Sequence, residues 1–224
     1  MNGELVTVIY FWKIKQRKVG FALLRMALDR GGLRRLHGVR FAKMLGAGKG
    51  ETFTPRDADI TRWGALIVIE QSQLAALDNS KLIKRWRTNS TDEVRYLVDP
   101  ISSHGLWAKV NPFDYVKSSG DGEVVAITRA RIKWAQNVRF WKAVPPVTIS
   151  LHQSPGLINA IGIGEAPIGL QGTFSLWESA SHLREFAYKG QAHTQAIKAT
   201  EENKWYSEEL FSRFAVIQER GNLK

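Results

Sequence analysis

The segment Leu157-Ile-Asn-Ala-Ile-Gly-Ile-Gly-Glu165 is followed closely by Ile168-Gly-Leu-Gln-Gly-Thr-Phe-Ser-Leu-Trp-Glu178. The first segment predicts a β-strand that ends in a tight glycine turn, and the second predicts another strand. Because side chains alternate along a strand, Phe174 should lie on one face and Thr173 and Trp177 on the other. We expect the apolar face to lie under a helix and the opposite face to border a space that can hold a ligand.

A helical pattern follows this strand and leads to a single histidine. His193, Ala196, Ile197 and Thr200 are spaced to share one helix face, and the imidazole has small or apolar neighbours. The histidine lies in the first turn after the break at Gly190, where the helix dipole disfavours imidazolium and keeps the ring able to bind iron. His193 is therefore our candidate ligand, and a histidine that only packs in the core or lies at the surface is the alternative.

The same order of elements is expected twice along the chain. In the first half we expect strands over Leu5–Lys13, Val39–Leu45, Ile60–Glu70 and Val94–Val98, with helices after the first and third. In the second half we expect strands over Glu123–Ile132, Leu157–Ile163, Ile168–Trp177 and Arg213–Gln218, with helices in the same places. Both halves therefore read β-α-β-β-α-β, which is the ferredoxin-like order.

The predicted fold class is α+β, with two tandem duplicated ferredoxin-like units that form an α+β barrel. Helices are expected outside this barrel, and a cavity is expected between the two sheets. Residues 1–100 form the first half, residues 101–122 form a linker with proline, serine and glycine, and residues 123–224 form the second half. The second half carries the candidate ligand His193.

Three local patterns add detail to this prediction. Phe21, Leu24 and Leu28 share one face of the first helix, which we expect to pack on the sheet. The pair Pro145-Pro146 is expected to end the helix that begins near Trp134. The segment from Trp205 to Leu210 is expected to be helical.

The composition indicates a globular protein with a strongly basic surface. The 224 residues carry a net charge of +11, contain no cysteine and are 44% hydrophobic. The missing cysteines exclude disulfides and thiolate chemistry, and no apolar run reaches the roughly 18–20 residues of a membrane span. The start of the chain lacks a signal-peptide pattern, so a cytoplasmic protein is expected. The positive charge favours anionic partners, including acidic lipid headgroups, unless it is only a solvated surface.

Several other motifs do not carry a function. The segment Gly46-Ala-Gly-Lys-Gly50 lacks the spacing of a phosphate-binding loop and joins two strands, so it predicts a tight turn. Spacings typical of zinc hydrolases are absent, and the other four histidines are expected at the surface. The strand Val39–Leu45 lacks the aromatic and basic consensus of RNA-recognition strands, so no nucleic-acid partner is expected.

Several longer segments carry a resemblance to a known family. They are Ala126-Ile-Thr-Arg-Ala-Arg-Ile132, Arg139-Phe-Trp-Lys-Ala-Val-Pro145, Ile161-Gly-Ile-Gly-Glu165, Gln171-Gly-Thr-Phe-Ser-Leu-Trp177, Gly190–Ile197 and Trp205-Tyr-Ser-Glu-Glu-Leu210. On these segments the chain resembles the spheroidene monooxygenase family, haem enzymes that oxidise an acyclic carotenoid to a ketone. The helix start Trp177-Glu-Ser is also similar to haem-degrading monooxygenases of the dimeric α+β barrel class, in which a histidine of this region binds the iron.

The resemblance implies a haem-dependent monooxygenase with haem packed between the two sheets. His193 would be the ligand to the haem iron. Arg129 and Arg131 lie on one side of a strand, and either could pair with a haem propionate. Gln171 and Thr173 would face the oxygen-binding side of the iron as the catalytic residues.

The remaining expectations concern substrate and partners. Trp141 and Trp177 would line the path of an apolar substrate, for which a carotenoid is the candidate. Dioxygen and an external ferredoxin or reductase are required, because no flavin or iron–sulfur motif is present. Peripheral contact with the inner face of the membrane would bring the protein to a lipid-soluble substrate.

Two other readings stay open. A non-enzymatic protein could bind haem or an apolar ligand on the same fold, and product formation would separate it from an enzyme. A duplicated barrel that has lost its cofactor is the third reading, and a close-packed interior without a pocket would favour it.

Overall fold

A computed structural model describes residues 3–115, 117–119, 122–133, 136–165, 172–189 and 206–223. The strands are β1 (Leu5–Ile14), β2 (Val39–Gly48), β3 (Ala58–Glu70), β4 (Ser90–Gly105), β5 (Val124–Ile132), β6 (Leu157–Gly164), β7 (Gly172–Trp177) and β8 (Tyr206–Asn222). The α-helices are α1 (Val19–Arg34), α2 (Leu74–Asp78), α3 (Lys81–Asn89), α4 (Asn137–His152) and α5 (Ala180–Lys189). Short 3-10 turns occupy Gln16–Lys18, Pro55–Asp57 and Gln71–Gln73. The predicted α+β class is confirmed.

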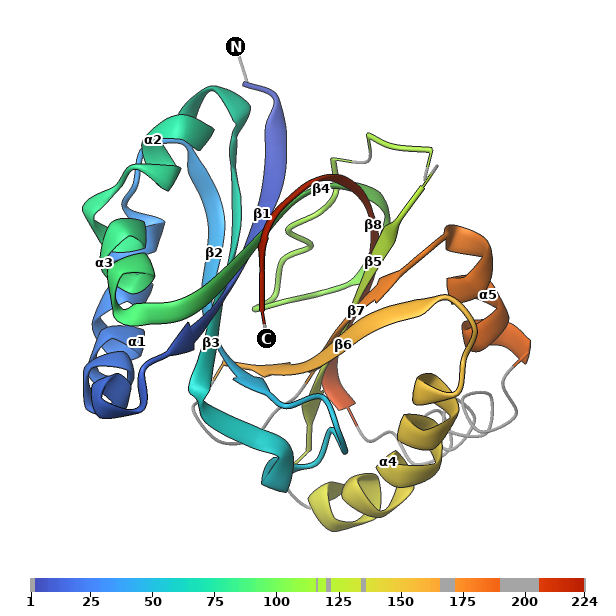
Figure 1. Cartoon of the computed structure of the whole chain (residues 1–224). Coiled ribbons are helices and arrows are strands. Elements are labelled where there is room, and N and C mark those ends of the chain that lie inside the picture. Colours follow the sequence, from blue (N-terminus) through green and yellow to red (C-terminus); the bar gives the residue numbers. More distant parts are fainter. Residues whose placement is uncertain are drawn as a thin grey trace.

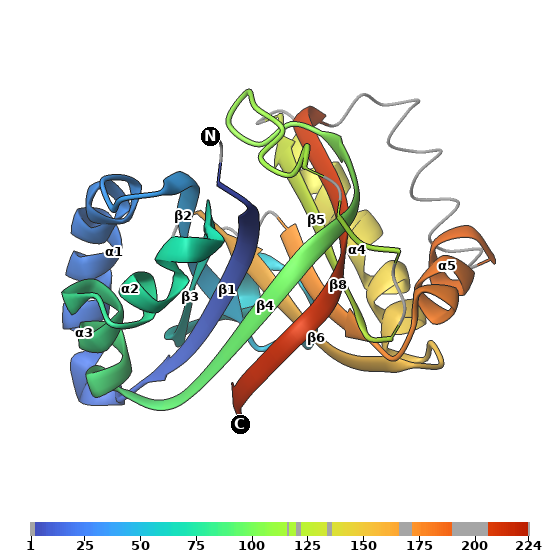
Figure 2. The ribbon, with the colours of Figure 1, turned by 90° about the horizontal axis from the view of Figure 1, so that it is seen from above.

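All neighbouring strands pair antiparallel, and the order β1-β3-β2-β6-β7-β5-β8-β4 closes into a barrel. Each half has its last strand next to its first, as in β4-β1-β3-β2 and β8-β5-β7-β6. The halves meet along the long β4–β8 ladder and at a short β2–β6 seam, where Gly46 pairs with Gly164 and Ala47 with Ile163. Figure 1 shows α1, α2 and α3 on one side of the strands and α4 and α5 on the other, and Figure 2 agrees.

Three apolar clusters hold these layers together. The first lies inside the barrel and includes Phe11 of β1, Phe174 of β7 and Phe214 of β8. The second packs the first-half sheet against α1 and α3, and the third packs the second-half sheet against α4 and α5. Because the interior cluster draws side chains from both halves, the two halves share one core.

The expected linker begins later than residue 101. Strand β4 continues to Gly105 and pairs with β8 over this region, so residues 101–105 belong to the sheet. Pro100 is accommodated in the strand at a register shift between Pro100 and Ser102, where an irregular ladder needs no N–H at the proline.

The expected buried face of the first helix is right for Phe21, which packs against Trp86, and wrong for the two leucines. Leu24 and Leu28 are 59% and 56% exposed, whereas Ala22, Met26 and Leu33 are buried. The buried face also contains Asp29, a charged residue that a hydrophobic pattern does not predict to be buried. Its carboxylate binds Arg25 and accepts a hydrogen bond of 2.9 Å from the indole N–H of Trp86.

Two further elements differ from expectation. Helix α4 continues through Pro145 and Pro146 to His152, and both prolines lie on its exposed side. Backbone carbonyls that lose an N–H partner to proline can be hydrated there, so the helix need not end. Strand β8 already begins at Tyr206 and extends to Asn222, so residues 206–210 are strand and not helix. The spacing of Leu210 and Phe214 suits either structure, and pairing with β4 and β5 decides it.

None of the helices in the described ranges has the length and apolar character that a membrane span requires.

Candidate active site

The two faces of β7 are oriented opposite to the prediction. Phe174 and Leu176 point into the barrel, with 0% and 2% exposure. Trp177 points outward to the helices, where its ring lies 5.4 Å from that of Phe186 in α5. Its indole N–H donates a 2.9 Å hydrogen bond to Ser175 Oγ. The apolar face is inside because closure of the barrel needs apolar side chains to fill its centre.

The barrel interior is filled by aromatic side chains. The ring of Phe174 lies 5.1 Å from that of Phe11 and 5.2 Å from that of Tyr96, and Phe113 lies 4.8 Å from Phe214. A void of about 10 Å³ is present at one end. The cavity expected between the sheets is therefore wrong for the described part of the chain, since this volume holds no more than a water molecule. This close-packed interior favours the third reading, a duplicated barrel without a cofactor inside it.

The outer face of the second-half sheet has unusually small side chains. One row across β5, β7 and β6 is Ala126–Ser175–Ala160, and the next row is Thr128–Thr173–Gly162. We call these two rows the small-residue face. Thr173, a predicted site residue, lies at its centre and is partly buried.

The matching face of the first half is bulky. Its rows across β1, β3 and β2 include Trp12–Trp63–Gly46 and Tyr10–Ala65–Met44, and these large side chains fill the space under α1 and α3. Because the two halves share one strand order, the difference is a property of the side chains. On the side of α4 and α5 the second-half sheet therefore carries small side chains. Ala126 and Ala160 are buried there, in the cluster that contains Phe53, Leu151 and Leu183. Ser175 is buried between them, whereas Thr128 is exposed.

Arg129 does not lie on this face. Its side chain is 4% exposed and points to the end of the barrel, where it binds Glu208 and lies 3.0 Å from Glu165 Oε1. The guanidinium also lies 5.6 Å from the centre of the Trp107 ring. Two carboxylates already neutralise Arg129, so the predicted pairing with a haem propionate has no support here.

Glu165 and Lys43 complete this network, and neither was predicted as a site residue. Lys43 Nζ lies 2.6 Å from Glu165 Oε2, and Trp107 Nε1 donates to Oε1 at 2.7 Å. Burial raises the pKa of Glu165, but the hydrogen bonds from Lys43 and Trp107 and the charges of Lys43 and Arg129 outweigh it and hold the pKa below its usual value. The available signal was the acidic residue that directly follows the glycines Gly162 and Gly164, which belong to β6 and do not form the predicted tight turn.

The other predicted site residues are only partly placed. Arg131 follows Arg129 on the same side of β5 and is exposed. Trp141 belongs to α4, but its side chain lies outside the described residues, as do Gln171 and His193. Within the described ranges, no three His, Cys, Asp or Glu side chains form a cluster that could hold a metal ion.

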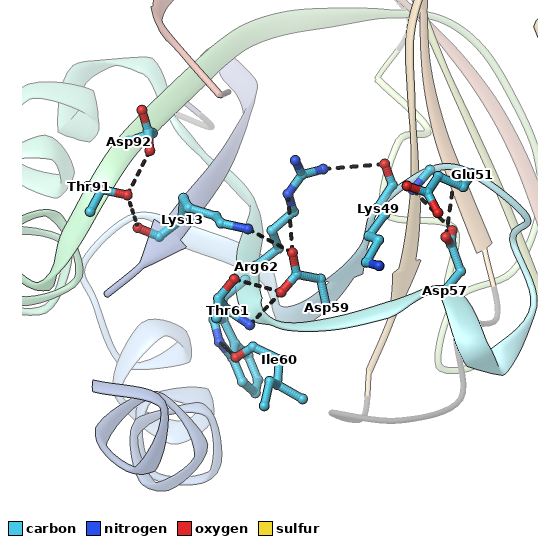
Figure 3. Close-up of polar contacts among 12 residues, drawn as sticks. Lys13, Lys49, Glu51, Asp57, Asp59, Ile60, Thr61, Arg62, Thr91 and Asp92 are labelled. Carbon is cyan, nitrogen blue, oxygen red and sulfur yellow. Dashed lines mark hydrogen bonds and ion pairs between the residues drawn. The ribbon is translucent and has the colours of Figure 1, made fainter. Parts of the chain in front are cut away.

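The connection after β2 is held together by the carboxylate of Asp57. Asp57 is buried and accepts hydrogen bonds from the backbone N–H groups of Gly50, Glu51 and Phe53 at 3.0, 3.2 and 3.2 Å. Figure 3 shows Asp57 facing Glu51 in this connection. These N–H groups are therefore not available to a phosphate. The predicted tight turn over Gly46–Gly50 is wrong, because Gly46 and Gly48 belong to β2 and residues 49–57 connect β2 to β3.

Comparison with known proteins identifies the family. No protein-family model matches the sequence. The chain is 34% identical over 208 residues to spheroidene monooxygenase of Rhodobacter capsulatus, covering 90% of this chain and 86% of that protein. It is 32% identical to spheroidene monooxygenase of Cereibacter sphaeroides, covering 96% of this chain and 67% of that protein.

One solved structure shares the fold at low sequence identity. An aldoxime dehydratase (OxdRE) in complex with butyraldoxime has a TM-score of 0.56 and 10% identity, covering 95% of this chain and 79% of that chain. This likeness concerns the fold alone. The sequence relatives confirm the resemblance seen in the motifs, and the chain therefore belongs to the spheroidene monooxygenase family and is a monooxygenase.

Proposed function

We propose that this monooxygenase depends on haem and acts on an apolar substrate of the carotenoid class. The support for the substrate class is the name shared by its relatives, spheroidene monooxygenase. The support for haem is the small-residue face, where Ala, Ser, Thr and Gly take the place of the aromatic side chains of the first half and Thr128 is exposed at the edge. A second proposal is that the two halves are tandem ferredoxin-like units, supported by their identical strand order.

The proposed haem position is the small-residue face and not the barrel interior. Thr173 and Ser175 supply hydroxyl groups there. Ser175 Oγ accepts a hydrogen bond from the indole N–H of Trp177, so the O–H of Ser175 can donate to another group. His193 is the proposed ligand to the haem iron. Bound haem supplies the oxygen chemistry, while the protein supplies the ligand, the polarity of the pocket and the placement of the substrate.

The polar groups of this face have limited roles. Thr173 and Gln171 are proposed as the residues that would hydrogen-bond on the oxygen-binding side of bound haem. Thr128 and Ala130 alternate with Arg129 and Arg131 along β5, so the two arginines project away from the small-residue face. Neither arginine is therefore proposed to bind a haem propionate. Trp177 donates a hydrogen bond to Ser175, packs against the ring of Phe186 and borders the small-residue face with an apolar side chain.

Two partners are part of the proposal. The reaction needs electrons from an external ferredoxin or reductase, since the sequence holds no flavin or iron–sulfur motif. A membrane is the natural source of a carotenoid, and the net charge of +11 favours one with anionic lipids.

The test is a haemin titration followed by visible spectroscopy. Wild-type protein should shift the Soret band with a one-to-one endpoint, and absence of that shift would refute the haem proposal. His193→Ala should alter the bound spectrum, and an unchanged spectrum would refute only the ligand assignment. With a reductant and dioxygen, the loaded protein should convert spheroidene to a ketone, whereas haem binding without product would favour the non-enzymatic reading.

A bulky substitution tests the position of the haem. Thr128 is exposed on β5, so Thr128→Trp should fold and cover part of the small-residue face. We expect its affinity for haemin to fall at least tenfold. Thr91→Trp is the matched control, because Thr91 is an exposed threonine of β4 in the other half. Equal affinities of the two variants would place the haem elsewhere.

A further inference from the structure

The outer side of α1 exposes a row of apolar side chains. Leu23, Leu24 and Leu28 are 42%, 59% and 56% exposed, and Ala27 lies exposed among them. Single exposed leucines are common on proteins, but these four residues fall within two helical turns. We call them the α1 face. Figure 1 shows α1 at the outer edge of the first half, with its opposite side toward the strands.

Positive charge surrounds the α1 face. Arg17 and Lys18 precede the helix, Arg34 and Arg35 end it, and all four are exposed. Residues 15–35 contain seven Lys or Arg and one acidic residue, Asp29. Within these residues, all of which the structure describes, no carboxylate is exposed, because Asp29 is 2% exposed.

The neighbouring helix extends this surface. Helix α3 packs beside α1 and adds the exposed Lys81 and Lys84, with no acidic residue in its sequence. By contrast, Lys13 before α1 is paired with Asp59 at 2.8 Å, so it belongs to a local ion pair (Figure 3). Lys81 and Lys84 therefore add two exposed cations to those beside the α1 face.

We propose that α1 is the membrane-contact element of this protein and lies in the plane of an anionic phospholipid surface. The leucines of the α1 face would enter the boundary between headgroups and acyl chains, and Arg17, Lys18, Arg34 and Arg35 would bind lipid phosphates. Helices that bind at this interface combine an apolar strip with flanking Lys and Arg in this way. An acidic protein would match the charges but would leave the four apolar residues without a role.

The lipid contact does not depend on haem, because α1 and the small-residue face belong to opposite halves (Figure 2). Only its use, which is to hold the enzyme where a carotenoid dissolves, rests on the proposed function. Failure of the haem proposal would leave vesicle binding unchanged, and failure of vesicle binding would leave the haemin titration unchanged.

The experiment is vesicle co-sedimentation of the full chain. Phosphatidylcholine vesicles with roughly 30% phosphatidylglycerol should bind the protein, pure phosphatidylcholine vesicles should bind it weakly, and added salt should release it. The double variant Arg34→Gln with Arg35→Gln should lower the partition coefficient onto the anionic vesicles about thirtyfold. Each cation near the membrane surface contributes roughly one kcal/mol to binding, and two of them are removed. Leu24→Gln with Leu28→Gln should lower it about tenfold or more.

Matched controls use equally exposed residues elsewhere. Ile217→Gln with Leu106→Gln removes apolar side chains that are 55% and 45% exposed, and Arg56→Gln with Arg184→Gln removes two exposed cations. Both controls should bind like wild type. Equal losses in the control and α1 variants would overturn the proposal.

Two other outcomes would also overturn it. Vesicle binding could be absent while the arginine variant loses only turnover with a reductase, which would make this surface a docking site for an acidic electron donor. Alternatively, the leucine variant could convert an oligomer to a monomer in size-exclusion chromatography without any vesicle binding, which would make the α1 face a contact between copies.

Discussion

Replacement of Glu165 by glutamine tests the charged network at the end of the barrel. The substitution keeps the shape of the side chain and removes its charge. Lys43 and Arg129 have side chains that are 9% and 4% exposed, so water cannot replace the lost counter-ion. Breaking a buried ion pair costs about 3–5 kcal/mol. Because the Glu165 side chain is 31% exposed and Arg129 keeps Glu208, we expect the lower end, about 3 kcal/mol.

The pH dependence gives a second check. The folded state holds the pKa of Glu165 below its usual value, so the stabilisation is present above the unfolded pKa of about 4.3 and is lost as pH falls through the folded pKa. Urea denaturation from about pH 7 down to about pH 3 should therefore show a shrinking difference between wild type and Glu165→Gln.

Two variants sharpen this test. Glu209→Gln changes an exposed carboxylate close by and should cost less than about 0.5 kcal/mol. Lys43→Met combined with Glu165→Gln should recover much of the loss, since it removes the unpaired lysine as well. A loss below about 1 kcal/mol at neutral pH, or an equal loss at acidic and neutral pH, would show that the network does not stabilise the barrel as argued.

Three other substitutions have expected outcomes. Phe174→Ala should lower the free energy of unfolding by about 3–5 kcal/mol in urea titration, because the side chain is fully buried inside the barrel, and a loss under about 1 kcal/mol would mean an open interior. Gly50→Ala should lower the melting temperature, because φ is +84° and a Cβ would lie 2.0 Å from the carbonyl oxygen of Ala160; an unchanged melting temperature would contradict this. Trp177→Phe should cost about 1 kcal/mol in the same titration through the lost hydrogen bond to Ser175, and a cost equal to that of Phe174→Ala would refute this small effect.

Strand β7 lies where a strand was predicted, but its two faces are reversed. Its period-two pattern predicted a strand and the residues that share each face, and Phe174 and Leu176 do lie together opposite Trp177. The pattern could not tell which face is inside, because both faces of this sheet are covered and both contain large apolar residues. Because the eight strands close into a barrel, Phe174 lies inside the barrel and Trp177 packs against the helices.

The same limit applies to Arg129 and Asp29. The partners of Arg129 are 36 and 79 residues away, at Glu165 and Glu208, so no local spacing could reveal that its charge is neutralised. Asp29 reads as a surface residue, yet Trp86 and Arg25 satisfy its carboxylate inside. Its burial turned α1 so that Leu24 and Leu28 face outward.

The amino-acid sequence alone determined the repeated order of strands and helices, the α+β class and the family, because these depend on local periodicity, turn residues and extended sequence similarity. Only the tertiary structure decided which face of the sheet lies inside the barrel and which lies under the helices. That choice depends on contacts between strands far apart in the chain, and a local pattern carries no information about them.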